Sequence, residues 1–262
     1  MARLDAVALD LDGTLLEPGG RILPDTLDLL RQAADQGVRV LLATGRPPRD
    51  IASLSARTGL AALGLPHAAV ANERDLLLFQ GDAWVEVQPR NALRQDREYL
   101  LTVELRPALE ALGAELAAID PAYTIWNEEQ SRDRGFTELH FQTPELARLA
   151  ARHVRGRILD GHPARPHIIC NRTLFAVRHA DSGKGPNLAE LCQLMGLSPR
   201  RVLAIGDAEN DRSMLDGAWG FEGGAPGNAE PPIADIVRQA GGRVAAGARG
   251  VGVAELLAPY LD

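Results

Sequence analysis

The segment Ala6–Thr14 ends a short apolar run with two carboxylates, Asp10 and Asp12, followed by Gly13. In an extended backbone, side chains two residues apart point the same way, so both carboxylates can face one crevice. Two like charges so close repel each other unless a cation or a shared proton relieves them. The pair therefore indicates a cation site or acid–base chemistry, and the alternative is a strand that ends in an ordinary Asp-Gly turn.

Three further segments carry polar side chains where an apolar run ends or a helix begins. They contain Thr44, Gly45 and Arg46; Lys184; and Gly206, Asp207, Asn210 and Asp211. Taken singly, each has a common structural alternative: a strand-to-helix turn, a solvated lysine, or a helix N-cap. Because the carboxyl ends of parallel strands meet at one edge of a sheet, we expect the segments to converge there.

Lys184 is the single lysine among the 28 lysines and arginines of the chain. Arginine is a planar fork, whereas lysine is a compact point charge. A chain that uses arginine everywhere else and lysine once indicates a position where a small ammonium group is needed. The alternative is chance.

The composition is that of a globular protein without a nucleic-acid or membrane partner. The chain has 262 residues, 45% of them hydrophobic, and a net charge of −7, whereas nucleic acids and anionic membranes favour a basic face. No apolar run is long enough to span a membrane. Two cysteines make no disulfide framework. We expect a cytoplasmic monomer or small homo-oligomer.

Both ends of the chain alternate between short apolar runs and helical patterns, which predicts an α/β parallel sheet. The expected strands are 6–9, 38–43, 68–71, 201–205 and 243–245. Helices are expected at 24–34, 47–57 and 188–195, with two more beginning near 229 and 251. The Gly/Pro-rich stretch after Phe221 is expected to be a loop.

The middle of the chain has a different pattern. Hairpins, alternating strands at 123–126 and 136–141, and helices at 91–112 and 144–155 predict an α+β arrangement. We therefore expect residues 81–180 to form an inserted domain, and residues 1–80 and 181–262 to form the surrounding core.

The segment Asp10-Leu11-Asp12-Gly13-Thr14 resembles the first motif of the haloacid dehalogenase-like (HAD) superfamily. The other three motifs follow in order at Thr44, at Lys184 and at Gly206–Asp211. The pattern from Gly206 to Leu215 is similar to that of the Cof-like branch. The resemblance implies a Rossmann-like parallel sheet core with an inserted α+β cap, and a small-molecule phosphate ester as substrate.

The resemblance also implies roles for the residues of these motifs. Asp10 would be the nucleophile, Asp12 the general acid and base, and Thr44 and Lys184 the groups that hold phosphoryl oxygens. Mg²⁺ would be bound by Asp10, the Asp12 backbone carbonyl, Asp207 and Asp211. The expected substrate-binding residues are Thr44, Gly45, Arg46, Lys184 and Asn210.

The expected activity is Mg²⁺-dependent hydrolysis of small phosphorylated metabolites, sugar phosphates first, through an aspartyl-phosphate intermediate. A phosphomutase and a non-hydrolytic phospho-accepting module are the alternatives. One departure is visible, since the Cof-like branch usually has Asn-Gly where this chain has Asn72-Glu73-Arg74. The candidates for substrate recognition in the inserted domain, each more commonly a surface charge, are Glu128, Arg132, Arg134, His140, Arg172 and Arg178.

Overall fold

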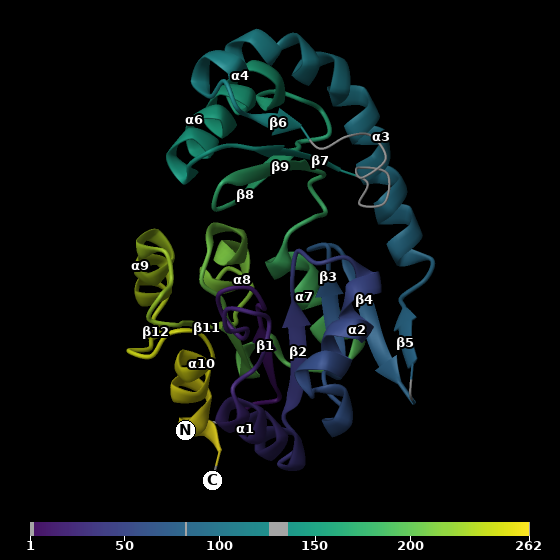
Figure 1. The fold of residues 1–262 in the computed structure, drawn as a ribbon. Helices are drawn as coiled ribbons and strands as arrows, with labels where there is room; N and C mark the ends of the chain where they lie inside the picture. Colours follow the sequence, from purple (N-terminus) through teal and green to yellow (C-terminus); the bar gives the residue numbers. More distant parts are fainter. Residues whose placement is uncertain (1–2, 82, 126–135, 262) are drawn as a thin grey trace. The chain divides into compact units, whose positions relative to one another are not determined.

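The computed structural model describes residues 3–81, 83–125 and 136–261, and the chain divides into two compact units (Figure 1). The first unit, here called the core, contains Met1–Val87 and Gly183–Asp262. The second, here called the inserted unit, contains Gln88–Ser182. The sequence places the first boundary after residue 80, whereas the structure carries the core through the strand Ala83–Glu86, which pairs with the core sheet.

The core is built on an eight-stranded sheet in the order β12-β11-β10-β1-β2-β3-β4-β5 (Figure 1). Its strands are β1 (Ala6–Leu9), β2 (Arg39–Ala43), β3 (Ala68–Ala71), β4 (Asp75–Gln80), β5 (Ala83–Glu86), β10 (Val202–Ile205), β11 (Glu222–Ala225) and β12 (Arg243–Val244). Neighbouring strands from β12 to β3 pair in parallel, and β4 pairs antiparallel with both β3 and β5. The predicted α/β class is confirmed.

Helices cover both faces of this sheet. They are α1 (Pro24–Asp35), α2 (Pro48–Thr58), α7 (Lys184–Leu194), α8 (Arg212–Leu215), α9 (Pro231–Gln239) and α10 (Arg249–Leu257). Short 3₁₀ helices are η1 (Ala61–Leu63), η3 (Pro199–Arg201), η4 (Glu209–Asp211) and η5 (Ala258–Tyr260).

Successive residues of the central strand β1 serve the two faces in turn. Val7 and Leu9 belong to one apolar cluster with α1, α2 and α10. Ala6 and Ala8 belong to the other, with α7, α8 and α9. A strand buried on both faces has no polar side, which is why the sequence shows a continuous apolar run instead of an alternation.

The stretch expected to be a loop after Phe221 is instead the parallel strand β11, between β10 and β12. Packing requires a glycine at position 223 of this strand. A Cβ atom added at Gly223 would lie 2.8 Å from the backbone oxygen of Leu215, closer than side-chain carbons approach carbonyl oxygens. This glycine therefore marks a close approach of two backbones. In the sequence, a strand that contains such glycines has the same pattern as a loop.

The inserted unit is an antiparallel sheet covered by helices, as its sequence predicts. The sheet has the order β6-β7-β9-β8. Its strands are β6 (Thr124–Ile125), β7 (Thr137–His140), β8 (His167–Asn171) and β9 (Leu174–Arg178), and its helices are α3 (Arg90–Ala111), α4 (Gly113–Ile119), α6 (Pro144–Val154) and the π-helix η2 (Arg155–Leu159). α4 lies beyond the predicted end of the preceding helix. The inserted unit has its own apolar cluster, in which Phe175 and Leu139 are fully buried.

The carboxyl ends of β10, β1 and β2 come together at one edge of the core sheet, because these parallel strands are neighbours (Figure 1). Asp207, Asp10 and Thr44 come one or two residues after these three strands. Among the described residues, no helix combines the length and apolar character needed to cross a membrane.

Candidate active site

Four charged side chains from distant segments meet at this edge, and we call them the Lys184 cluster: Asp10, Lys184, Asp207 and Asp211. Lys184 is the first residue of α7, and its Nζ atom donates to Asp10 Oδ1 at 2.6 Å and to Asp211 Oδ1 at 2.5 Å. Its side chain is 0% exposed. The alternative of a solvated lysine is therefore wrong.

The backbone around η4 holds Asp211 in place. Its Oδ2 atom accepts hydrogen bonds from the backbone N–H groups of Asp207, at 2.9 Å, and Ala208, at 3.0 Å. The carboxylate occupies the space beside Gly206, where an added Cβ atom would lie 2.4 Å from Asp211 Cγ. The glycine of the Gly206-Asp207 segment thus makes room for the carboxylate that binds Lys184.

Asp207 is positioned by the first motif. The Thr14 hydroxyl donates to Asp207 Oδ1 at 2.9 Å, and both residues are buried. The N-cap alternative for Asp207 does not account for this hydrogen bond, because the donor, Thr14, belongs to the segment after β1 and not to the helix that Asp207 would cap. Thr14 is a positioning residue to which the sequence assigned no role, although it stands in the first motif.

The donor set of this cluster fits a hard divalent cation. Asp10, Asp207 and Asp211 each offer a carboxylate oxygen, and these oxygens lie within 4.8 Å of one another. All three residues are buried, and Lys184 supplies one positive charge against their three negative ones. Carboxylate oxygens in an acidic site are the ligands that Mg²⁺ prefers.

Burial and mutual repulsion perturb the pKa values within the cluster. Desolvation, followed by repulsion from Asp211 and Asp207, raises the pKa of Asp10 well above its usual value, although Lys184 opposes the shift. Burial alone would lower the pKa of Lys184, but the carboxylates of Asp10, Asp211 and Glu73 outweigh it and raise that pKa. Lys184 is therefore a permanent cation, and the site has a surplus of negative charge that a bound cation would relieve.

Asp12 lies in a more open environment than Asp10. Its carboxylate accepts two hydrogen bonds from the Arg46 guanidinium, from Nε at 2.8 Å and from Nη2 at 2.6 Å. The Asp12 side chain is 58% exposed. This contact raises the pKa of Arg46, chiefly through the hydrogen bond with Asp12. The Asp12 carboxylate does not belong to the group of side-chain oxygens that fits a metal among the described residues.

The turn after β2 is stabilised by its own threonine. The backbone N–H of Arg46 donates to Thr44 Oγ1 at 3.1 Å, so the turn-forming role of Thr44 is present. A hydroxyl group that accepts one hydrogen bond still has its proton to donate. Thr44 is buried and remains a candidate donor to a phosphoryl oxygen.

The other predicted substrate residues lie beside a carboxylate to which the sequence assigned no role. Asn210 Nδ2 donates to Glu73 Oε1 at 2.8 Å. A Cβ atom added at Gly45 would lie 3.6 Å from the same oxygen. Glu73 was visible in the sequence only as a departure from the usual Asn-Gly.

The candidates in the inserted unit have different environments. Arg178 is buried and paired with Glu98, with Nε–Oε1 at 2.6 Å, so it is not a solvent-facing recognition residue. His140 is partly buried, 3.6 Å from Glu138, and Arg172 lies in the β8–β9 turn with φ +52°. Three further candidates, Glu128, Arg132 and Arg134, lie outside the described residues.

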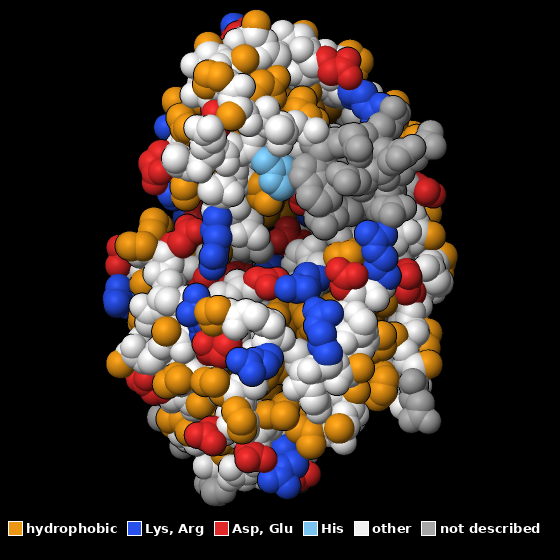
Figure 2. All heavy atoms as spheres, viewed as in Figure 1, with side chains coloured by type: hydrophobic (Ala, Val, Ile, Leu, Met, Phe, Trp, Pro, Cys, Tyr) orange, Lys and Arg blue, Asp and Glu red, His pale blue; other side chains and the backbone are white. Residues whose placement is uncertain are grey.

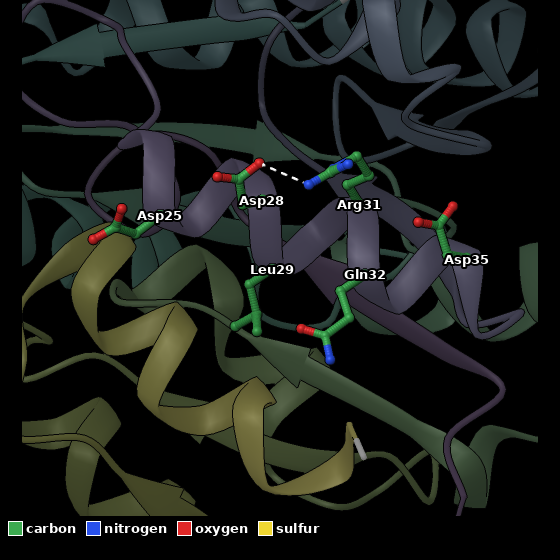
Figure 3. A pocket seen from close by; sticks show the side chains of 6 residues that line it. All are labelled: Asp25, Asp28, Leu29, Arg31, Gln32 and Asp35. Carbon is green, nitrogen blue, oxygen red and sulfur yellow. Dashed lines mark hydrogen bonds and ion pairs between the residues drawn. The ribbon is translucent and has the colours of Figure 1, made fainter.

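A groove of about 500 Å³ lies along the exposed side of α1 and contains none of the predicted site residues. Figure 3 shows its lining side chains: Asp25, Asp28, Leu29, Arg31, Gln32 and Asp35. Asp28 and Arg31 form an exposed ion pair at 3.2 Å. On the face of the core in Figure 2, acidic and basic side chains are interspersed, with no broad basic patch.

A family model for haloacid dehalogenase-like hydrolases matches residues 7–69 and 170–241, which contain all four motifs. The chain is 28% identical over 251 residues to the phosphoglycolate phosphatase of Pyrobaculum neutrophilum, covering 95% of this chain and 92% of that protein. It is 27% identical over 260 residues to the HMP-PP phosphatase of Klebsiella pneumoniae, covering 89% of this chain and 87% of that protein.

The fold is shared with solved structures. The sucrose-phosphatase of Synechocystis sp. PCC6803 superposes with a TM-score of 0.70 at 18% identity, over 99% of this chain and 98% of that one. The motifs, the geometry and the family match agree. This chain belongs to the haloacid dehalogenase-like hydrolases, in the Cof-like branch that its motifs predict.

Proposed function

We propose that the protein is a Mg²⁺-dependent phosphatase that hydrolyses small phosphorylated metabolites, sugar phosphates first, through an aspartyl-phosphate on Asp10. The observation that carries the proposal is the Lys184 cluster. One carboxylate, Asp10, lies in contact with a buried ammonium and close to two further buried carboxylates. Phosphatases among the relatives support the reaction class.

The first step forms a bond between an Asp10 carboxylate oxygen and phosphorus and breaks the bond from phosphorus to the ester oxygen. A phosphate ester resists this attack because its oxygens repel the nucleophile, so positive charge must offset the repulsion. Lys184 provides a fixed ammonium, and the Thr44 hydroxyl provides a donor. Mg²⁺, held by Asp10, Asp207, Asp211 and the Asp12 carbonyl, would supply further positive charge to the phosphoryl oxygens.

Asp12 would handle the protons in both steps. As a carboxylic acid it gives a proton to the departing alkoxide, and as a carboxylate it takes one from the water that cleaves the acyl-phosphate. That water restores Asp10 and releases inorganic phosphate. The two hydrogen bonds from Arg46 connect the Asp12 carboxylate to the turn after β2. In this proposal, the unit Gln88–Ser182 is the cap of the family.

The test is a screen of phosphorylated metabolites with purified protein, with and without Mg²⁺, following the release of phosphate. We expect multiple turnovers that require Mg²⁺ and leave no isomerised ester. Conversion of a sugar phosphate to its isomer would indicate a phosphomutase. A stable phosphoaspartate with a single turnover would indicate a phospho-accepting module. Either result would overturn the proposal.

A further inference from the structure

The turn between β3 and β4 has a backbone that favours glycine but contains a glutamate. Asn72 has φ +50° and Glu73 has φ +55°, and the backbone N–H of Arg74 donates to the Ala71 oxygen at 2.9 Å. Two successive residues with positive φ in a tight hairpin turn favour Asn-Gly, because glycine has no Cβ to clash. A glutamate at the second position strains the turn, and such strain is commonly retained at functional sites.

Glu73 connects several segments of the site. Its backbone oxygen accepts from Gly183 N at 2.8 Å and from Asn187 Nδ2 at 3.0 Å, directly before and within α7. Its carboxylate is held by Asn210 and lies next to Gly45. The residue is 4% exposed. The strained position therefore places a carboxylate between two predicted substrate-binding residues.

This carboxylate adds to the negative charge of the Lys184 cluster. It is one of the groups that raise the pKa of Lys184, together with Asp10 and Asp211. The phosphoryl group of a substrate is met by Lys184 and the bound cation. A second anionic group of the same substrate that reached the position between Gly45 and Asn210 would meet the buried Glu73 carboxylate. Like charges in a partly desolvated site repel strongly.

Glu73 also fixes which atom Asn210 offers to a ligand. An ionised carboxylate only accepts hydrogen bonds, so the amide nitrogen of Asn210 faces Glu73. The amide oxygen, Oδ1, is then the atom with which Asn210 can accept a hydrogen bond from a ligand. An acceptor of this kind suits a hydroxyl group, which donates, and gives nothing to a carboxylate or phosphate.

We propose that Glu73 determines specificity at this site, favouring phosphate esters whose alcohol part carries hydroxyl groups and disfavouring those that carry a second anionic group. This inference rests on the proposed phosphatase function and adds the class of substrate to it. The name of the Pyrobaculum relative refers to a substrate with such a second anion, so the inference separates this chain from that relative.

The test uses two esters of similar size, 2-hydroxyethyl phosphate and phosphoglycolate, which differ by a hydroxymethyl group in place of a carboxylate. With wild-type protein we expect kcat/KM to favour 2-hydroxyethyl phosphate by about tenfold or more. Glu73→Gln keeps an acceptor for Asn210 but removes the charge. It is expected to reduce this preference by about tenfold, mainly through a lower KM for phosphoglycolate.

Glu209→Gln is the matched control, because it makes the same change in net charge at the residue next to Asn210. Glu209 forms an ion pair with Arg212 at the surface. It is expected to leave the preference unchanged. Glu73→Gly is the second variant. It also removes the charge, and it relieves the turn, so we expect the same loss of preference without a lower Tm.

Three outcomes overturn the inference. The first is a wild-type preference for phosphoglycolate. The second is a preference that stays within twofold in both Glu73 variants while both remain folded and active. The third is a Glu209→Gln preference that shifts as much as that of Glu73→Gln. If the wild-type protein releases phosphate from neither ester nor from p-nitrophenyl phosphate, the proposed function itself fails, and the inference fails with it.

Discussion

The core and the inserted unit each bury a cluster of charged side chains, and the two clusters differ in charge balance. In the inserted unit, Arg178 and Glu98 are 2% and 0% exposed. The Glu98 carboxylate accepts from Arg178 Nε and Nη2, from the His179 backbone and from the Ser182 hydroxyl. The Arg178 guanidinium also lies 3.8 Å over the Phe136 ring. In the contacts between described residues, one positive charge meets one negative charge, and the carboxylate has four donors.

The Lys184 cluster has three carboxylates and one ammonium, so its charges do not balance. Buried charges are tolerated when they are paired and hydrogen-bonded. A buried ion pair with balanced charges therefore indicates a structural role. A buried cluster with surplus charge indicates a bound ion or ligand that is not part of the chain. Burial of charged side chains alone therefore does not identify a functional site, whereas the sign and size of the surplus charge do.

The largest effect is expected from Asp10→Asn, which removes the nucleophile. The amide cannot form the acyl-phosphate, so kcat should fall by about 10³-fold or more. Phosphate release is measured in protein free of wild-type contamination. The pKa of Asp10 is raised by burial and by its neighbours. The neutral variant should therefore have a free energy of unfolding at least as high as that of the parent. Activity within tenfold of wild type would remove Asp10 from the nucleophile role.

Removal of the metal tests the charge surplus directly. Chelation with EDTA should abolish turnover, and added Mg²⁺ should restore it and raise Tm, because a cation that binds only the folded state stabilises it. Asp207→Asn should reduce the Mg²⁺-dependent rise in Tm. Glu98→Gln is the matched control in the balanced cluster and should keep that rise. An equal rise in wild type and Asp207→Asn would contradict the proposed metal site.

Lys184→Arg keeps the charge but changes its shape. The Lys184 ammonium donates hydrogen bonds to both Asp10 and Asp211. A planar guanidinium cannot occupy the same position. We expect kcat/KM to fall by about 10²-fold, with the folded state retained. Arg178→Lys is the reciprocal substitution in the balanced cluster and should lower stability while leaving kcat/KM within a few fold. A near-normal kcat/KM for Lys184→Arg would make the single lysine a coincidence.

Glu98→Gln should act on stability and spare chemistry. It removes the negative charge that the buried Arg178 guanidinium contacts at 2.6 Å, which is expected to cost about 3 kcal/mol in free energy of unfolding. Guanidinium denaturation followed by circular dichroism measures this loss. The kcat for p-nitrophenyl phosphate at low temperature serves as the control. A loss of activity in fully folded protein would show that the balanced cluster contributes to function after all.

The smallest effect concerns His167, which lies near Arg178. Burial, and next the charge of Arg178, lower the pKa of His167 to about 4. The unfolded chain, with an ordinary histidine pKa, then takes up the proton first as pH falls. Stability should be constant above about pH 6.5 and decrease below it, by about 2 kcal/mol at pH 5. The His167→Gln variant should lose that part of the acid sensitivity, and an unchanged difference between pH 7.5 and pH 5 would contradict the assignment.

The sequence located most strands and helices closely, because apolar runs and helix punctuation are local signals. The strand Ala68–Ala71 was predicted with the bounds that it has. β11 was missed because Gly223 is required by the close approach of the Leu215 backbone, which lies on a different element. The first boundary of the inserted unit was placed early, because the hairpin of β4 and β5 gives no local sign of joining the core sheet.

The sequence by itself determined which residues end the parallel strands, and therefore that Asp10, Thr44 and Asp207 would lie at one edge. Only the tertiary structure decided how the charges there are shared. Lys184 and Asp10 are 174 residues apart in the chain, and Arg178 and Glu98 are 80 apart. Periodicity records which way a side chain points, but the partner it meets depends on how distant elements pack. For that reason the balance of charge, which separates the candidate active site from a structural ion pair, was visible only in the folded protein.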